Sequence, residues 1–363
     1  MSMKRKWIWA AGILAALGGG APAGAQVTTR VTHAWLQAVN EEGFTTNPVP
    51  HPIVLRGVVL NDPGEMLDPS YDPDATDEVT KGGEFQLFIQ GVEGDRGGTA
   101  LWMAQNYDAA APWKPGVKDY GAEWTQELAR VMQSGFRKGN VVDVTARMSL
   151  FYGGKWNINE NHSTNSANDF DIVLVKENAG LPPAEAITLA DLKNADDSAI
   201  FDATRATGGE HWQGMRVRLD GIRLADTNGW GQSAWNDRLC TAVDGTGRTL
   251  PLRMPRTDLG DPPLTSRWFS AVGILNQESG SSTSGTNGYE LFVQEIGPEL
   301  DLGRSASGGI AVSFSADYEG YVLEASDDNL ETWTAVDAMP VRVIWIEDEA
   351  ASPNREYRLR KAD

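Results

Sequence analysis

The chain has 363 residues, enough for two or three domains, and a formal net charge of −19 from 31 basic and 50 acidic residues. A surface of this sign repels a phosphate backbone unless the arginines gather on one face, so the composition disfavours a nucleic-acid-binding protein. The single cysteine, Cys240, excludes an internal disulfide. Because it lies among apolar strand residues, we expect it to be a buried small side chain.

The N-terminus has the pattern of an export signal. Basic residues 4–6 precede an apolar run over residues 7–17, and small residues end at Ala25 in an A-x-A pattern. This pattern predicts cleavage between Ala25 and Gln26, and a mature protein that is secreted, periplasmic or at the cell surface. The apolar run is too short to span a membrane. Cleavage would remove three basic residues and no acidic one, taking the net charge from −19 to −22.

Alternating apolar and polar residues predict three strands early in the mature chain, over residues 53–60, 84–90 and 99–104. Gly57 lies inside the first of them and predicts a bulge or a sharp bend. Further on, apolar residues recur at helical spacing and predict a single helix. They are Tyr120, Trp124, Leu128 and Val131.

The segment 139–159 has the clearest strand pattern of the chain. Its first strand turns four apolar residues to one face, namely Val142, Val144, Ala146 and Met148. Gly153 and Gly154 then reverse the chain, and Trp156 and Ile158 share the core side of the returning strand. Another strand is predicted over residues 170–175. The order strand, strand, strand, helix, strand, strand is that of an OB-fold, a five-stranded Greek-key barrel.

The second half of the chain repeats this order without the helix. Residues 216–222 echo residues 54–58, and further strands are predicted over 239–243, 249–254, 268–275 and 289–294. We therefore suspect an internal repeat. Residues 181–184 form a proline linker between the copies, and residues 188–192 lead into a segment that fits no predicted element.

The last part of the chain predicts a small β-sandwich of the immunoglobulin or fibronectin kind. Its five short strands are expected over residues 310–314, 321–325, 333–336, 341–346 and 356–360. The sequence thus predicts an all-β protein with two OB-like Greek-key barrels, the first with one helix. The predicted parts are a signal peptide at 1–25, OB-like modules at 26–180 and 185–302, and the sandwich at 308–363.

Two patches of sequence suggest a family. Residues 321–327 (YVLEASD), with Trp333-Thr334 and Tyr357-Arg358-Leu359-Arg360, resemble the C-terminal β-sandwich modules of many secreted bacterial proteins. Residues 53–300 are similar to an uncharacterised secreted bacterial family with tandem OB-like modules, through the patches at residues 87–91 (LFIQG) and 229–231 (GWG). Neither resemblance implies a reaction or supplies catalytic residues.

The sequence offers little support for catalysis. It contains no G-x-S-x-G elbow and no H-E-x-x-H helix, and we expect His162 to be a loop residue. The acidic loop over residues 61–83 suits calcium by its oxygen ligands, although its spacing departs from that of an EF-hand. Its candidate ligands are Asp68, Asp72, Asp74 and Asp77. We expect no cofactor, with calcium as the only candidate.

A binding surface is the remaining prediction. OB barrels bind oligosaccharides or oligonucleotides across the face of their second and third strands. In the first module the outer face combines flat aromatic rings with amide side chains, a mixture that suits a sugar. The predicted ligand-binding residues are Gln86, Phe88, Gln90, Trp102, Arg147, Tyr152, Asn157 and Asn159.

The sequence therefore predicts an exported, non-catalytic protein that recognises an extracellular polymer or cell-surface component. The few cations on the predicted face favour a glycan over nucleic acid. Two alternatives stay open. One is a metal-dependent hydrolase or nuclease that uses carboxylates, and the other is a structural cell-surface protein without a soluble ligand.

Overall fold

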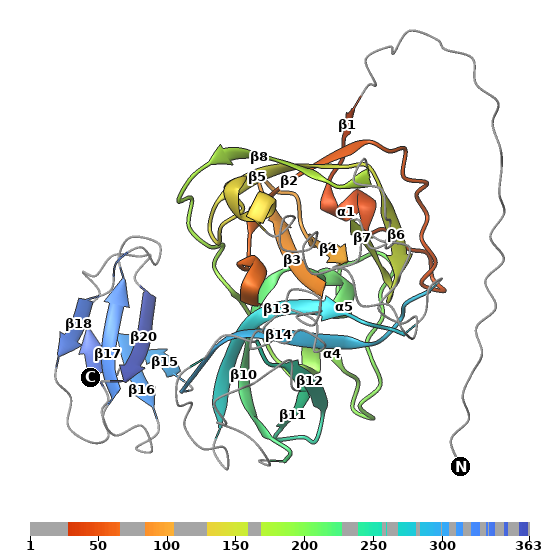
Figure 1. Cartoon of the computed structure of the whole chain (residues 1–363). Coiled ribbons are helices and arrows are strands. Elements are labelled where there is room, and N and C mark those ends of the chain that lie inside the picture. The colour runs from red at the N-terminus through yellow and green to blue at the C-terminus, as the bar shows by residue number, and fades with distance from the viewer. Residues whose placement is uncertain are drawn as a thin grey trace, which may run out of the picture.

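A computed structural model gives the fold of the protein (Figure 1). It describes residues 28–65, 84–104, 129–158, 168–226, 239–255, 259, 268–280, 284–298, 300–304, 310–314, 321–326, 332, 334–337, 345–347 and 356–361. The described residues form mostly strands with a few short helices, so the predicted all-β class is confirmed. None of the helices in these ranges has the length and apolar character that crossing a membrane requires.

The first sheet contains eight strands and extends over residues 29–176. Its order is β6-β7-β4-β3-β2-β5-β8, and β1 pairs with β2 in parallel. The strands are β1 (Thr29–Arg30), β2 (Ile53–Val59), β3 (Glu84–Gly91), β4 (Gly98–Ala104), β5 (Val141–Ala146), β6 (Ser149–Tyr152), β7 (Lys155–Ile158) and β8 (Asp171–Lys176). Two residues join β5 to β6, so the chain itself links the two ends of the six-strand path from β6 to β5.

The core of the first sheet follows the predicted alternation. Leu87 and Ile89 of β3, and Val142 and Val144 of β5, are fully buried in one cluster. Short helices cover its ends: α1 (His33–Leu36), the 3-10 turn η1 (Pro63–Glu65) and a helical turn over residues 129–133. Val131 of that turn is buried in the cluster, while the other residues of the predicted helical face lie outside the described residues.

The second sheet forms a closed barrel. Its path β11-β12-β14-β13-β10 returns to β11, and β12 runs parallel to β14. The strands are β9 (Glu185–Ile187), β10 (Arg216–Leu224), β11 (Leu239–Asp244), β12 (Thr249–Arg253), β13 (Phe269–Gln277) and β14 (Tyr289–Pro298), with helices α4 (Leu189–Leu192) and α5 (Gly208–His211) before β10. The prediction of a barrel in the second half of the chain is confirmed. Cys240 is buried in its core, as expected.

The two sheets share a pattern of pairing. In each, a short strand pairs in parallel with the first long strand: β1 with β2, and β9 with β10. In each, the third long strand is parallel to a strand later in the chain: β4 to β7, and β12 to β14. The pairs Leu101–Ile158 and Leu252–Leu291 occupy the same place, with all four side chains buried in a core. We name residues 29–176 the first copy and residues 185–298 the second copy.

The sequence predicts a bulge or a sharp bend at Gly57, and the pairings of β2 with its neighbours show no bulge there. Neither neighbour of β2 shows a change of register at this residue. Gly57 instead allows a close approach, because a Cβ there would lie 2.6 Å from the backbone oxygen of Gln90. The change of register occurs in the second copy, between Leu219 and Ile222 of β10.

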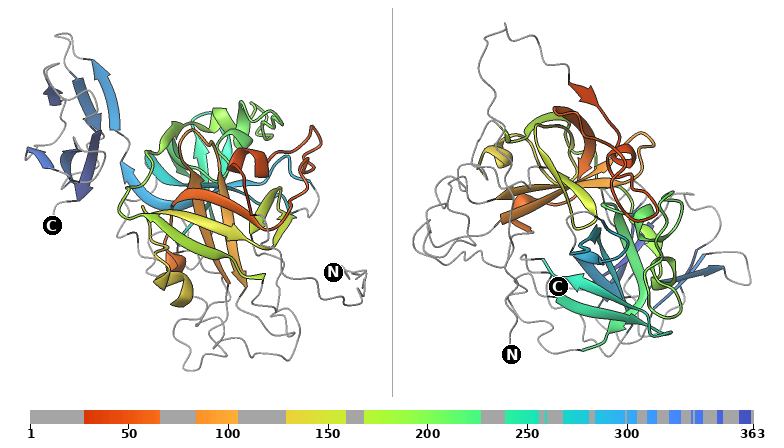
Figure 2. Two further views of the ribbon diagram at one scale, coloured as in Figure 1. Left: turned by 90° about the horizontal axis from the view of Figure 1, so that it is seen from above. Right: turned by 90° about the vertical axis from the view of Figure 1, so that its right-hand side faces the viewer.

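Two three-stranded sheets make up the described C-terminal part, and lie to one side of the other sheets (Figures 1 and 2). Their orders are β15-β16-β19 and β18-β17-β20. The strands are β15 (Leu300–Arg304), β16 (Ile310–Phe314), β17 (Tyr321–Ser326), β18 (Thr334–Asp337), β19 (Trp345–Glu347) and β20 (Glu356–Lys361). Five of them fall where strands were predicted. The sixth, β15, lies where the sequence predicts the end of the second module.

Candidate functional site

Half of the eight predicted ligand-binding residues of the first copy are not accessible. Gln86, Phe88, Gln90 and Asn157 are all buried. Phe88 and Gln90 of β3 lie outside the core cluster of the first sheet, as predicted, but residues of the second copy cover them: Phe88 packs on Phe292, and Gln90 bonds to Arg216. The expectation that they face solvent is therefore wrong.

An apolar contact holds the first sheet against the barrel. Phe88 packs edge-to-face on Phe292 of β14, with ring centroids 5.5 Å apart. Leu60, Ala100 and Ile274 are buried in the same cluster. Burying a phenylalanine side chain contributes roughly 1.5–3 kcal/mol, so this cluster stabilises the contact between the copies.

Polar groups extend the contact on both sides of the aromatic pair. Gln90 accepts a hydrogen bond of 2.8 Å from the backbone N–H of Arg216, and Gln294 donates one of 2.6 Å to the carbonyl of Leu60. Lys155 is buried, although it carries a charge. Its Nζ donates to the carbonyl of Gln277 at 2.6 Å and to Glu278 at 2.5 Å. These pairings satisfy groups that would otherwise be costly to bury.

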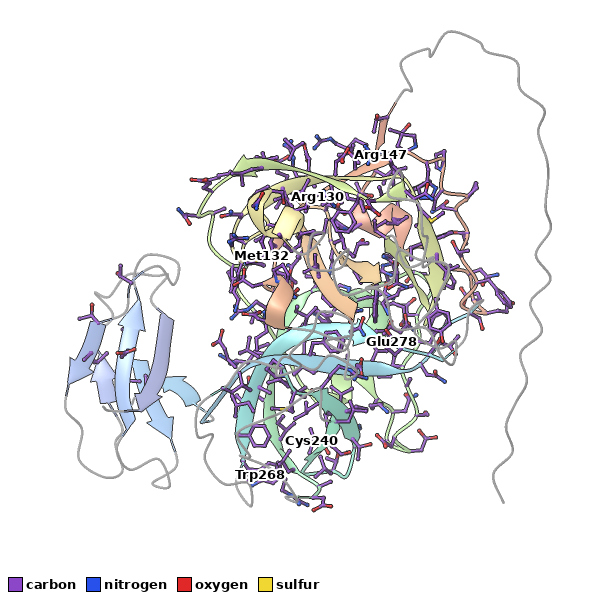
Figure 3. All side chains as sticks on the ribbon, in the orientation of Figure 1. Arg130, Met132, Arg147, Cys240, Trp268 and Glu278 are labelled. Carbon is purple, nitrogen blue, oxygen red and sulfur yellow. The ribbon has the colours of Figure 1, made fainter. Side chains whose placement is uncertain are left out.

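Two glutamates at this contact are neutralised by basic partners. Glu278 pairs with Lys155, and Glu290 pairs with Arg253 at 3.0 Å. The amide of Asn276 donates to both carboxylates, at 3.3 and 3.2 Å. Figure 3 shows Glu278 between the first sheet and the barrel. Since each carboxylate is held by a cation and an amide, their geometry stabilises the contact between the copies and does not resemble a pair poised for acid and base catalysis.

Glycines bring the two copies together backbone to backbone. A Cβ on Gly98 would lie 2.0 Å from the oxygen of Gly214, and a Cβ on Gly285 would lie 2.2 Å from the Cα of Gly154. Neither distance is compatible with a side chain. The first sheet and the barrel are thus fitted to each other at positions where only glycine is accommodated.

The remaining predicted site residues do not form one surface. Trp102 is half-buried and donates to Asn157 Oδ1 at 3.1 Å. Arg147 is exposed and pairs with Asp171. Tyr152 is exposed at the β6–β7 turn. Asn159, His162 and the four acidic candidates Asp68, Asp72, Asp74 and Asp77 lie outside the described residues.

The barrel presents the equivalent face to solvent. Matching the cores of the two copies places Thr241 of β11 where Phe88 stands in β3, and Pro251 of β12 where Ala100 stands in β4. Thr241 and Pro251 are exposed, and Leu239 is 55% exposed. The face that the first copy uses to hold the barrel is therefore open in the second copy.

An aromatic ring flanks this open face. Trp268 is 43% exposed, and the guanidinium of Arg223 lies over its ring at 5.9 Å from the centroid. A Cβ on Gly245, in the β11–β12 turn, would lie 3.6 Å from the ring. Figure 3 shows Trp268 at the end of the barrel far from the first sheet. We name Arg223, Leu239, Thr241, Pro251 and Trp268 the open face.

Buried titratable groups lie away from this face. Tyr289 donates to Glu210 Oε1 at 2.7 Å, and both side chains are buried. Burial raises the pKa of Glu210 above its usual value and raises that of Tyr289 well above its own. Because a substrate cannot reach them, we assign them to the packing of the barrel. Among the residues that the structure describes, no group of three His, Cys, Asp or Glu side chains could hold a metal ion.

No protein-family model matches the chain, and no curated protein is significantly similar to it. The candidate site thus rests on geometry. Sequence reasoning missed the open face because it assigned Trp268 to the fourth strand and weighed only the first copy for binding. One sequence signal could have extended the repeat to β1–α1 and β9–α4. Both copies carry the pattern Thr-x-Ala-x-Leu, at residues 32–36 and at residues 188–192.

Proposed function

We propose that the protein is an exported, non-catalytic module that binds an extracellular glycan on the open face of its second copy. We further propose that both copies are OB folds, which bind ligands across their second and third strands. In the second copy these strands are β11 and β12. One observation carries the proposal: the face is buried under the barrel in the first copy and open in the second.

The composition of the open face favours a sugar. An exposed indole offers a flat apolar surface for a pyranose ring, and threonine supplies hydroxyl contacts without charge. A nucleic acid would need several cations to neutralise its phosphates, and it would meet a chain with a net charge of −19. Arg223 already lies over the ring of Trp268, so it orients the indole.

The test uses the mature chain, residues 26–363, on an array of polysaccharides, with single-stranded DNA as a comparison ligand. We expect Trp268→Ala to weaken the retained glycan at least roughly tenfold, which corresponds to about 1.4 kcal/mol. Arg223→Gln should weaken it less. Tyr152→Ala is the matched control, because Tyr152 is an exposed aromatic residue outside the open face.

Circular dichroism would establish that each variant keeps its fold. If no polysaccharide is retained, or if Trp268→Ala binds as well as the parent protein, the proposal is wrong. Preferential binding of single-stranded DNA would contradict the choice of ligand class.

A further inference from the structure

An amine, a carboxylate and a carboxamide meet where β7 approaches the end of β13. Lys155 Nζ donates to Glu278 Oε1 at 2.5 Å, and Asn276 Nδ2 donates to the same oxygen at 3.3 Å. Lys155 belongs to the first copy, and the other two residues belong to the second copy. One carboxylate oxygen therefore contacts both an amine and an amide nitrogen, across the contact between the copies.

The backbone holds these side chains in place from both copies. Asn276 lies opposite Glu290 in the pairing of β13 with β14, and its Nδ2 donates to Glu290 Oε1 at 3.2 Å. Lys155 directly follows the glycine turn between β6 and β7, where the carbonyl of Gly153 accepts from the backbone N–H of Ser279 at 2.9 Å. Groups fixed side by side in this way react far faster than the same groups free in solution.

Burial sets Lys155 apart from a surface lysine. Only 4% of its side chain is exposed, whereas 34% of the Lys138 side chain is exposed in its 2.8 Å pair with Glu65. Asn276 is 1% exposed, and its Oδ1 has no hydrogen-bond partner among the described residues. A buried ion pair has lost its hydration, so transfer of one proton from the amine to the carboxylate leaves two neutral groups. A neutral amine is a nucleophile.

We infer that Lys155 and Asn276 form an isopeptide bond that joins the two copies covalently. Glu278 takes a proton from Lys155 Nζ, and the neutral amine attacks Cγ of Asn276. The Nζ–Cγ bond forms, and the Cγ–Nδ2 bond breaks. Two protons pass from Nζ through Glu278 to Nδ2, so the nitrogen leaves as ammonium and the carboxylate is regenerated. The step uses one carboxylate for both transfers and needs no oxidant or reductant.

The bond changes what the contact between the copies costs and what it contributes. A neutral amide replaces a charged amine that is costly to bury. The bond also closes a long loop of chain between residues 155 and 276, which removes conformational entropy from the unfolded state. The single cysteine of the chain excludes an internal disulfide, so the isopeptide bond supplies a covalent link of another chemistry.

The test is mass spectrometry of the mature chain, residues 26–363. A tryptic digest should contain a branched peptide that joins Lys155 to Asn276, with no cleavage after Lys155 and a mass lower by one ammonia molecule than that of its two parts. Sequencing of this peptide is required, because Gln26, the predicted first residue of the mature chain, also loses ammonia when it cyclises. In denaturing electrophoresis the parent chain should migrate faster than an unlinked variant, because its closed loop keeps it more compact.

Lys155→Arg keeps the charge and Asn276→Ala removes the reacting carbonyl, so both variants should lack the branched peptide. Glu278→Gln should slow formation of the bond by roughly 100-fold or more. Lys138→Arg is the matched control, because Lys138 is paired outside this cluster, and it should form the bond as the parent chain does. Circular dichroism would establish that each variant folds. Complete cleavage after Lys155 in the folded parent chain, or loss of water in a link to Glu278, would overturn the inference.

Discussion

At the scale of single residues, His33 shows how the fold fixes a protonation state. Its side chain is fully buried, with Nε2 3.2 Å from the carbonyl of Arg56 and Nδ1 2.7 Å from Thr99 Oγ1. A carbonyl only accepts, so Nε2 carries the proton and Nδ1 accepts from the Thr99 hydroxyl. Burial lowers the pKa of His33 below its ordinary value of 6.5, although Asp95 acts in the opposite direction.

This burial predicts a pH dependence of stability. Below about pH 6.5 the unfolded chain binds a proton at His33 that the folded chain does not, so the free energy of unfolding falls as the pH falls. The loss is at most about 1.4 kcal/mol per pH unit. Urea unfolding between pH 8 and pH 5.5 should show a shallower dependence in His33→Gln than with His33 present.

Burial also lowers the pKa of His51, which titrates in the same range. The comparison is therefore made in a His51→Gln background. Equal pH slopes with and without His33 would contradict the assignment. At pH 8 the histidine is neutral in both the folded and the unfolded chain. His33→Gln should still lower the free energy of unfolding there by about 1–3 kcal/mol, because hydrogen bonds are lost.

At the scale of elements, the turns through which the two copies touch have no room for an added side-chain atom. Gly285→Ala should destabilise the protein by about 1–3 kcal/mol, because its Cβ would lie 2.2 Å from the Cα of Gly154. Gly64→Ala is the matched control, since nothing lies within 4 Å of a Cβ at that position. Thermal unfolding of both variants would check the prediction. If the two variants melt at the same temperature, the backbones at Gly285 and Gly154 can separate without a loss of stability.

Individual strands also show which features of the fold could be predicted from the sequence. Period-2 alternation predicts β3 and β5 correctly, and also which of their side chains enter the core, because that choice is local to the strand. Whether the other face meets solvent depends on residues far away in the chain. Phe88 and Phe292 lie in different copies, and no periodicity relates them. Short elements such as β9 and α4 escaped prediction because a few residues carry too little pattern.

At the scale of the whole molecule, the contact between the copies predicts cooperative unfolding. The first sheet and the barrel share an aromatic pair, a buried lysine and backbone contacts, so we expect one calorimetric transition for residues 29–298. Phe88→Ala should cost about 3–5 kcal/mol and make the two parts unfold separately. A double-mutant cycle with Phe292→Ala should give a coupling of about 0.5–1.5 kcal/mol.

Tyr152→Ala, at an exposed site on the first sheet, should leave the single transition intact. Two transitions within residues 29–298, or zero coupling between the phenylalanines, would contradict a contact that stabilises both parts.

The way the copies meet is heterologous: the β3–β4 surface of one unit lies on the β13–β14 surface of the next. Such a contact leaves one free surface of each kind after two units have joined. Repeated among identical units, it would generate a ring or a filament. The geometry therefore sets no limit of two units. The limit lies in the side chains of the terminal unit, where Thr241 and Pro251 replace the phenylalanine and alanine that a third unit would have to bury.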